Sequence, residues 1–504
     1  MPAPDPTPPL PASRLSRWLA QAPTPVFIAY AVLAAFTTYF CMYAFRKPFA
    51  AAKFEGLHFL GTAVSLKTAL VVSQIIGYAC SKYAGIKVCS EITPARRATT
   101  LVGLILAAEA ALVLFGLLPN HLKLVAIFLN GFPLGMVWGL VVWYLEGRRT
   151  SDVLMAGLAC SFIVSSGVTK DFGRALMAGG IADGWRAVPL VGPWIGDRLG
   201  PVSEAWMPAL TGLHFLPVFL LAVWMLQQLP RANAADVLAR APRTPMTAAD
   251  RRVFLRRFGG GMFLLCLAYL CLTAYRDFRD NYQVELFEEL GYRYRDDQII
   301  ISRAETLVTA GVIAMMAFLN LFHDNRRALG VAFGIMVGGL ALLALGTALR
   351  RAGVLSGFWW MTLTGLGSYL AYVPFNTMLF ERLMALTRAA GTAVFGIYVA
   401  DAVGYTASVG TQLYKDLGQG GMSRLGFFEG FTWLTAGVAA CCLAAAAVYF
   451  LRPAGNPPNW PFARESRRPR GGPRRGRPLS LCSTPNSKFN QATRNPAPLP
   501  PPEE

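Results

Sequence analysis

Charged side chains are scarce in this sequence. Only 15% of its 504 residues are Asp, Glu, Lys or Arg, and 54% are hydrophobic, whereas soluble globular domains carry charge on about a quarter of their residues. The mean hydropathy is +0.42. This composition excludes an ordinary water-soluble enzyme and predicts a polytopic membrane protein.

Signatures of metal sites and of catalysis are missing as well. The nine cysteines include no CxxC pair, and the four histidines are too scattered to suggest a metal site. No GxSxG, HExxH or GxxxxGKS/T pattern occurs. The first 25 residues contain no apolar core, so we expect no cleaved signal peptide. We also expect no metal, no other cofactor and no enzymatic activity.

Apolar stretches long enough to cross a bilayer recur along the chain. A hydrocarbon core of about 30 Å needs about 20 helical residues, and twelve segments approach or exceed this length. The sequence therefore predicts an all-α membrane protein with twelve transmembrane helices. The predicted spans are 26–45, 64–84, 98–118, 122–145, 153–169, 206–228, 258–275, 299–321, 328–349, 353–380, 390–412 and 426–451.

The loop at 229–257 is rich in Pro, Ala and Arg, and it divides the spans into two groups of six. After Arg452 the chain turns to Pro and basic residues, which cannot bury a core, so we expect a disordered tail. The predicted parts are an N-terminal segment 1–25, a six-helix bundle 26–228, a central loop 229–257, a second six-helix bundle 258–451 and the tail 452–504.

The net charge of +19 is unevenly distributed along the chain. Segments 1–25, 229–257 and 452–504 carry net charges of +1, +5 and +7, whereas 277–298 carries −4. Because cytoplasmic loops are enriched in Lys and Arg, both termini and the central loop are expected in the cytoplasm. The basic tail then contacts anionic lipid headgroups in preference to nucleic acid. We expect the protein to be a monomer in the bilayer.

The two halves of the sequence repeat. The segment Tyr39–Arg46 at the end of the first span resembles Tyr269–Arg276 at the end of the seventh, with Tyr, Cys, Ala and Arg in register at an offset of 230 residues. Weaker echoes follow in the same order, LEGR at 145–148 with FER at 380–382 and the two alanines of 156–159 with those of 390–393. Duplicated bundles are a common construction of secondary transporters.

The repeat brings a specific chemistry with it. Residues four and then three apart share one face of a helix, so Tyr39 and Tyr43 form one stripe with Arg46, and Arg276 ends the corresponding stripe. Two guanidinium forks facing each other would bind a divalent anion such as phosphate. Alternatively, each arginine extends to the membrane interface and binds nothing. The predicted substrate ligands are Arg46, Arg276, Lys82, Tyr39, Tyr43 and Tyr275.

Several other charges lie inside or beside apolar runs, where they are costly unless they face a partner or a cavity. Lys67 is a candidate for the anion site or for the interface. Glu109 and Asp401 are candidate proton carriers, and an ion pair with a nearby base is the alternative. Glu305 and Arg303 point apart on a helix and are expected to pair elsewhere. We therefore treat Lys67, Glu109, Glu305 and Asp401 as coupling or ion-pair candidates.

Together these motifs resemble the major facilitator superfamily, and most closely its organophosphate:phosphate antiporter branch. The resemblance covers Arg46–Phe49 after a Tyr-rich span, Gly77–Gly85, Gly131–Trp138 and the Gly-rich segment Gly391–Tyr405. It implies two six-helix bundles with pseudo-twofold symmetry in a bacterial inner membrane. It further implies that Arg46 and Arg276 hold a substrate phosphate, assisted by Lys82.

The sequence departs from that branch at a few positions, which indicates a divergent member. Glu91 stands where the branch has Asp, and Phe162 lies near the place of its histidine in the fifth span. The expected function is secondary transport of a small anionic solute, an organophosphate or a phosphate-like molecule, by alternating access. The alternatives are a proton-coupled symporter of another organic solute and a membrane sensor derived from a transporter.

Overall fold

The computed structural model describes residues 13–145, 148, 150–180, 201–230, 248–322, 324–387 and 393–452. This part of the chain is nearly all helical, and it contains no strand beyond a single bridge between His58 and Ser65. The described residues form one compact unit that ends at Arg452. The predicted tail, Arg452 excepted, lies outside the described residues, as do 231–247 of the predicted central loop.

Twelve long helices in the described part correspond one to one with the predicted spans, which confirms the all-α fold class. Nine of them are long and apolar enough to cross a membrane by length and composition. The helices are α2 (Thr24–Arg46), α3 (Leu66–Glu91), α4 (Arg97–Leu117), α5 (Lys123–Leu145), α6 (Ser151–Ala178), α9 (Met207–Gln227), α11 (Ala248–Asn281), α13 (Ile300–Leu319), α14 (Asn325–Arg351), α15 (Gly357–Pro374), α17 (Ala393–Gly418) and α18 (Arg424–Leu451).

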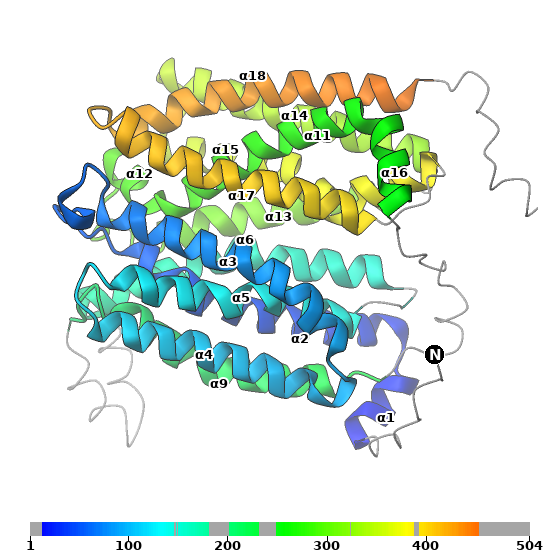
Figure 1. Ribbon diagram of the computed structural model, residues 1–504, viewed down its shortest axis with the longest axis horizontal. Helices are drawn as coiled ribbons and strands as arrows, with labels where there is room; N and C mark the ends of the chain where they lie inside the picture. The colour runs from blue at the N-terminus through cyan, green and yellow to red at the C-terminus, as the bar shows by residue number, and fades with distance from the viewer. Residues whose placement is uncertain are drawn as a thin grey trace, which may run out of the picture. The chain divides into compact units, whose positions relative to one another are not determined.

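Each half of the chain has its own hydrophobic core. Helices α2 to α6 and α9 surround one cluster of buried side chains, and α11 with α13 to α18 surround the other. Figure 1 shows the first set, in blue to green-cyan, below the second, in green to orange. We call these sets the N-terminal and C-terminal halves. The boundaries predicted for the two bundles stay predictions, and α11 begins at Ala248, inside the predicted loop.

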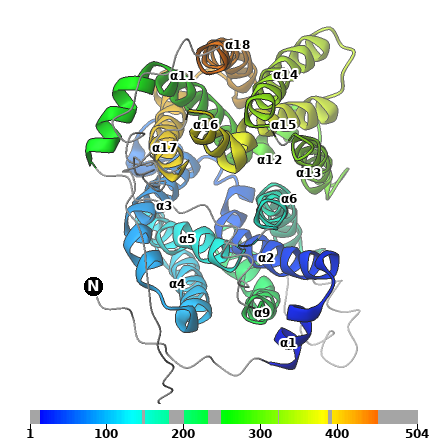
Figure 2. The same cartoon turned by 90° about the vertical axis from the view of Figure 1, so that its right-hand side faces the viewer.

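The two ends of the molecule differ. The short helix α1 (Arg14–Gln21) and the end of α18 lie at the right-hand end of Figure 1, and the short helix α12 (Gln283–Glu289) lies at the left-hand end. We call these the α1 end and the α12 end. Figure 2 looks along the helices from the α1 end, with α2, α3, α5 and α6 facing α11, α13, α15 and α17.

Glycines let neighbouring helices approach closely within each half. A Cβ atom on Gly131 of α5 would lie 2.5 Å from the backbone oxygen of Gln74 on α3. A Cβ atom on Gly367 of α15 would lie 2.4 Å from the backbone oxygen of Gly339 on α14. At such distances from a backbone atom, only a residue without a side chain fits these crossings.

The repeated segments end differently in the two halves. Helix α2 stops at Arg46, because Pro48 follows and opens a 3₁₀ turn at Pro48–Ala51. Helix α11 runs five residues past Arg276, to Asn281. In the tenth span, α15 passes at Pro374 into a π-helical turn, Phe375–Leu379, and then into α16 (Phe380–Thr387). Such turns redirect side chains within a helix, and this one presents Asn376 to the space between the halves.

Candidate functional site

A cavity of about 360 Å³ lies between the two halves, and both arginines of the repeat line it. Its walls come from α2, α3, α5 and α6 on one side and from α11, α15 and α17 on the other. The α5 and α6 residues that line it belong to the parts of those helices nearest the α1 end. The lining residues that carry polar groups or aromatic rings are Tyr39, Tyr43, Arg46, Tyr78, Lys82, Trp138, Trp143, Phe162, Arg276, Tyr372, Asn376, Thr377, Asp401 and Tyr405.

Arg46 lies at the last residue of α2, with its guanidinium carbon 4.0 Å from the centre of the Tyr78 ring. The Tyr43 ring, one turn earlier, lies 5.6 Å away. No carboxylate of the described residues pairs with Arg46, and its buried Nε has no hydrogen-bond partner among them. The guanidinium is therefore supported by aromatic faces and retains donors for a ligand in the cavity.

Arg276 has a similar position in the other half. Its guanidinium carbon lies 4.1 Å from the centre of the Tyr372 ring, and its Nη2 lies 2.7 Å from Oδ1 of Asp277. The second oxygen of Asp277 accepts a hydrogen bond from Ser408 at 2.9 Å. Because one carboxylate engages only part of the guanidinium fork, Arg276 also has donors to offer to a ligand.

Of the predicted substrate ligands, Tyr39, Tyr43 and Lys82 also line the cavity, and Tyr275 does not. Tyr275 is fully buried in the core of the C-terminal half, where its ring stacks on Phe428 and its hydroxyl lies 3.0 Å from that of Thr432. The expectation for Tyr275 was wrong because consecutive helical residues point about 100° apart. Since Arg276 faces the cavity, Tyr275 faces inward.

The four coupling or ion-pair candidates separate into two groups. Asp401 lines the cavity and accepts a hydrogen bond from the Tyr269 hydroxyl at 2.6 Å. Lys67 and Glu305 lie outside the cavity in ion pairs, with Glu285 at 2.5 Å and with Arg279 at 2.8 Å. For Lys67 and Glu305, the structure therefore shows the ion pairs that the sequence offered as one of two interpretations.

Glu109 lies outside the cavity as well, on α4 against Gly212 of α9. Its Oε2 atom is buried and has no hydrogen-bond partner among the described residues. The ion pair that the sequence offers as an alternative for Glu109 is therefore not formed with any described base. Arg303, expected to pair away from Glu305, contacts Asp297.

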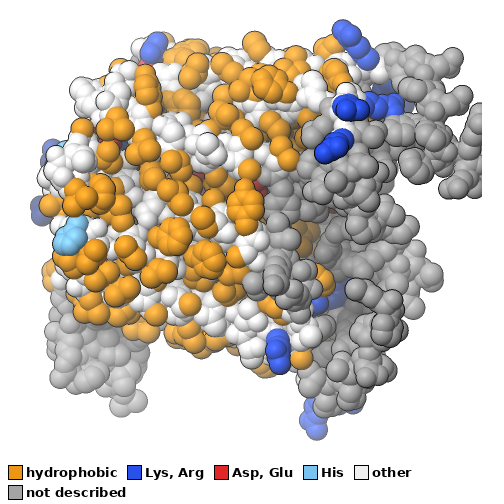
Figure 3. Space-filling model, viewed as in Figure 1, with side chains coloured by type: hydrophobic (Ala, Val, Ile, Leu, Met, Phe, Trp, Pro, Cys, Tyr) orange, Lys and Arg blue, Asp and Glu red, His pale blue; other side chains and the backbone are white. Residues whose placement is uncertain are grey.

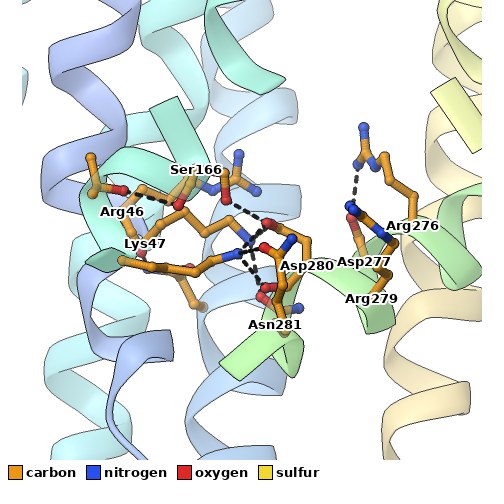
Figure 4. A network of polar contacts seen from close by, with 12 residues as sticks. Arg46, Lys47, Ser166, Arg276, Asp277, Arg279, Asp280 and Asn281 are labelled. Carbon is orange, nitrogen blue, oxygen red and sulfur yellow. Dashed lines mark hydrogen bonds and ion pairs between the residues drawn. The ribbon is translucent and has the colours of Figure 1, made fainter. Parts of the chain in front are cut away.

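Ion pairs close the molecule on the α12 side of the cavity. Lys47, directly after Arg46, places its ammonium 2.5 Å from Asp280 and 2.9 Å from the side-chain oxygen of Asn281. Lys170 of α6 contacts the same carboxylate at 2.6 Å, and Ser166 donates a hydrogen bond to it. In Figure 4, Lys47, Ser166 and Asn281 gather around Asp280, and Arg276 lies on the other side with Asp277.

Further contacts between the halves extend this closed region toward α12. Lys67 pairs with Glu285, and Lys53 with Glu288 at 2.5 Å. Partial burial alone would lower the pKa of Lys53, but its hydrogen bond to Glu288 and the charge of that carboxylate raise the pKa above its ordinary value. We call Lys47, Lys53, Lys67 and Lys170 with Asp280, Glu285 and Glu288 the closing layer. Its lysines all come from the N-terminal half and its carboxylates from the C-terminal half.

The charge of the cavity lining is unbalanced. Among the described residues, three cationic side chains line it, those of Arg46, Lys82 and Arg276, against one carboxylate, that of Asp401. The lining therefore carries two more positive than negative charges. Unbalanced charge in a membrane-spanning region is costly, so a bound anion would stabilise this arrangement.

Sequence reasoning missed the aromatic supports of the arginines, Tyr78 and Tyr372, together with Trp138 and Asn376. One signal was available, because Tyr372 follows Trp138 by 234 residues, the offset that also relates the alanines of 156–159 to those of 390–393. Trp138 contacts Tyr39 at 4.9 Å between ring centres, and Tyr372 stacks on Tyr269 at 5.2 Å. The repeat therefore also pairs Trp138 with Tyr372, which contact the equivalent tyrosines Tyr39 and Tyr269.

Twelve helices in two halves around a central cavity define the fold of the major facilitator superfamily, and solved structures agree. The nucleoside transporter NupG and the D-xylose-proton symporter each match with a TM-score of 0.52 at 12% identity, over 84% of this chain and 99% and 97% of theirs. FucP, a Major Facilitator Superfamily transporter solved in the outward conformation, matches with a TM-score of 0.50 at 12% identity, over 83% of this chain and 98% of its own.

The chain itself belongs to a family of unknown function (DUF5690), whose model matches residues 48–191 and 181–453. No curated protein matches the sequence. This fold, together with nine described helices that are long and apolar enough to cross a bilayer, indicates an integral membrane protein with several transmembrane helices. Transporters named for different solutes share this fold, so the residues that line the cavity, and not the fold, indicate the substrate.

Proposed function

We propose that this protein is a secondary active transporter that moves a small anionic solute, an organophosphate or a phosphate-like molecule, by alternating access. The single observation that carries the proposal is the cavity in which Arg46 and Arg276, one from each half, face the same space. Two planar forks suit the oxygens of phosphate or carboxylate groups. The surplus of positive charge in the lining favours an anion.

The closing layer supplies the second element of the mechanism. It holds the two halves together on the α12 side of the cavity, while the cavity extends toward the α1 end. A bound anion would neutralise the arginines and lower the free energy of bringing the halves together around it. Rocking of the halves would then break the closing layer and expose the anion at the α12 end.

Charge-conserving variants test the proposal. Arg46→Lys and Arg276→Lys keep the charge and remove the planar fork, so we expect each to lower the transport of ethyl phosphate into proteoliposomes by about tenfold or more. Arg350→Lys is the matched control, because Arg350 pairs with Glu429 away from the cavity. If transport of phosphate, organophosphates and carboxylates survives both cavity variants unchanged, the assignment of the site is wrong.

A proton-coupled symporter is the second candidate, favoured by one observation. Asp401 lines the cavity beside the cations and is held by the Tyr269 hydroxyl, where a carboxyl group could take up a proton and a solute together. One of the solved neighbours is a D-xylose-proton symporter. Exchange of internal for external solute without a pH gradient would favour the antiporter. Uphill uptake that needs the gradient and Asp401 would favour the symporter.

We further propose that the α1 end faces the cytoplasm of a bacterial inner membrane. The basic segments 1–25 and 229–257 support this orientation under the positive-inside rule. The cavity would then face the cytoplasm and the closing layer the outside. Protease protection of tags at both termini in right-side-out vesicles tests the orientation, since cleavage from outside would contradict it.

A further inference from the structure

A second cavity lies on the membrane-facing side of the molecule, between α3 and α17. It has a volume of about 410 Å³ and is lined by six residues of α3 between 75 and 83 and five of α17 between 401 and 409. Both segments lie near the middle of their helices. Figure 1 shows α3 and α17 side by side at the front, and Figure 3 shows that hydrophobic side chains dominate this face of the protein. We call this cavity the side groove.

The side groove adjoins the central cavity. Lys82, Asp401 and Tyr405 line both. Apart from Lys82, Asp401 and Thr406, the groove is lined by aliphatic side chains, tyrosines and a cysteine. Its outer rim includes Ile76, 43% exposed, and Tyr83, 71% exposed. From the membrane-facing surface toward the arginines, the lining therefore changes from apolar to cationic at Lys82.

A second apolar groove differs from the side groove in its lack of charged lining residues among those described. It lies on the other side of α17, against α11 and α18, and includes Ala407 and Leu434. None of the described residues that line it also lines the central cavity. A groove that only accommodates bilayer lipid needs no charged residues at its inner end, where they are costly. The side groove has Lys82 and Asp401 there.

We propose that the transported anion is amphipathic, with a phosphate-like headgroup between Arg46 and Arg276 and a single alkyl or acyl chain in the side groove. This inference rests on the proposed function and narrows its substrate class. The chain stays in apolar surroundings while the headgroup is bound, and Lys82 contacts the headgroup where the chain leaves the cavity. Since each buried methylene group favours binding, affinity measured from water rises with chain length.

Ethyl phosphate and decyl phosphate are the probes, and their binding to the full-length protein in lipid nanodiscs is measured by equilibrium dialysis, with empty nanodiscs subtracted. We expect decyl phosphate to bind about tenfold tighter or more. Ala402→Trp and Ile76→Trp fill the groove from its two walls, so each should remove this gain and leave the affinity for ethyl phosphate unchanged. Ala407→Trp, an equivalent change in the other groove, should preserve the gain.

The outcomes separate this inference from the proposed function. Equal affinities for the two phosphates, or a gain that survives both groove variants, overturn the amphipathic substrate and leave the anion site standing. Decyl phosphate binding that persists in the double variant Arg46→Gln and Arg276→Gln is partition into lipid alone and overturns it too. If neither phosphate binds the unmodified protein, the phosphate-like substrate and this inference both fail.

Discussion

Lys47, whose ammonium lies 2.5 Å from the carboxylate of Asp280, directly follows Arg46 in the chain. Asp280 in turn follows Arg276 by four residues, one turn further along α11. Each cavity arginine is therefore joined by a few backbone bonds to one member of the ion pair that closes the molecule. A ligand that moves the arginines also moves Lys47 and Asp280, which gives substrate binding a direct route to the closing layer.

Removing the Asp280 charge should open the α12 end. The Asp280→Asn variant leaves Lys47 and Lys170 without their shared carboxylate, and loss of one member of a buried ion pair costs about 3–5 kcal/mol. The measurement is the alkylation rate of a cysteine introduced at the buried Ala50, in a version without native cysteines. A membrane-impermeant maleimide should react about tenfold faster or more after the substitution.

Asp297→Asn is the control for this experiment. Asp297 pairs at the same end with Arg303, whose side chain is 52% exposed, and exposed pairs contribute about 1 kcal/mol or less. Its alkylation rate should match that of the unmodified sequence. Equal rates in all three proteins would mean that Asp280 does not hold the α12 end closed.

Replacing Tyr372, whose ring packs against Arg276, should weaken ligand binding. Replacing Tyr275, which precedes Arg276 in the chain, should not. Tyr372→Leu removes the ring that lies 4.1 Å from the guanidinium, and such contacts contribute about 0.5–2 kcal/mol. We expect the dissociation constant for ethyl phosphate to rise by about threefold to thirtyfold. Tyr275→Phe loses only the hydrogen bond to Thr432 and should leave it unchanged. Equal effects would contradict the orientation of α11.

The contrast between Tyr275 and Tyr372 shows what the sequence can supply. Hydropathy gives the twelve spans because the bilayer dictates their length, and the repeat gives Arg46 and Arg276 because duplicated halves place equivalent residues alike. Neither signal fixes the rotation of a helix about its axis. Arg276 and Tyr275 are adjacent in the chain, yet the first side chain lines the cavity and the second is buried in the core.

Partners of buried charges are a second limit on prediction from sequence. The cost of charge in lipid marks Lys67, Lys170 and Glu305 as residues that need partners. The partners come from other helices, at sequence separations of 218 residues for Lys67 with Glu285 and 110 for Lys170 with Asp280. Such pairs depend on how the two halves approach each other, so only the folded arrangement assigns them.

Removing the carboxylate of the cavity should tighten anion binding. Asp401→Asn raises the surplus of positive charge in the lining from two to three, and a charge at this range in a partly hydrated site changes binding by about 1–2 kcal/mol. The dissociation constant for ethyl phosphate should fall by about tenfold in nanodiscs. Glu109→Gln, a neutralisation outside the cavity, should not change it. Weaker binding in Asp401→Asn would instead make Asp401 a direct ligand, as the symporter requires.

Close packing of α3 against α5 should make Gly131 intolerant of a side chain. In Gly131→Ala the new methyl group would lie 2.5 Å from the backbone oxygen of Gln74, which cannot move without shifting α3. Overpacking of this kind costs about 1–3 kcal/mol, so the apparent unfolding temperature in detergent should fall. Gly103→Ala is the matched control on α4, where no described atom beyond the adjoining helix backbone lies within 4 Å of the new methyl group. Alanine exceeds glycine in helix propensity by about 1 kcal/mol, so Gly103→Ala should unfold at the same or a higher temperature. A lower temperature for both variants would contradict the α3–α5 crossing as the cause.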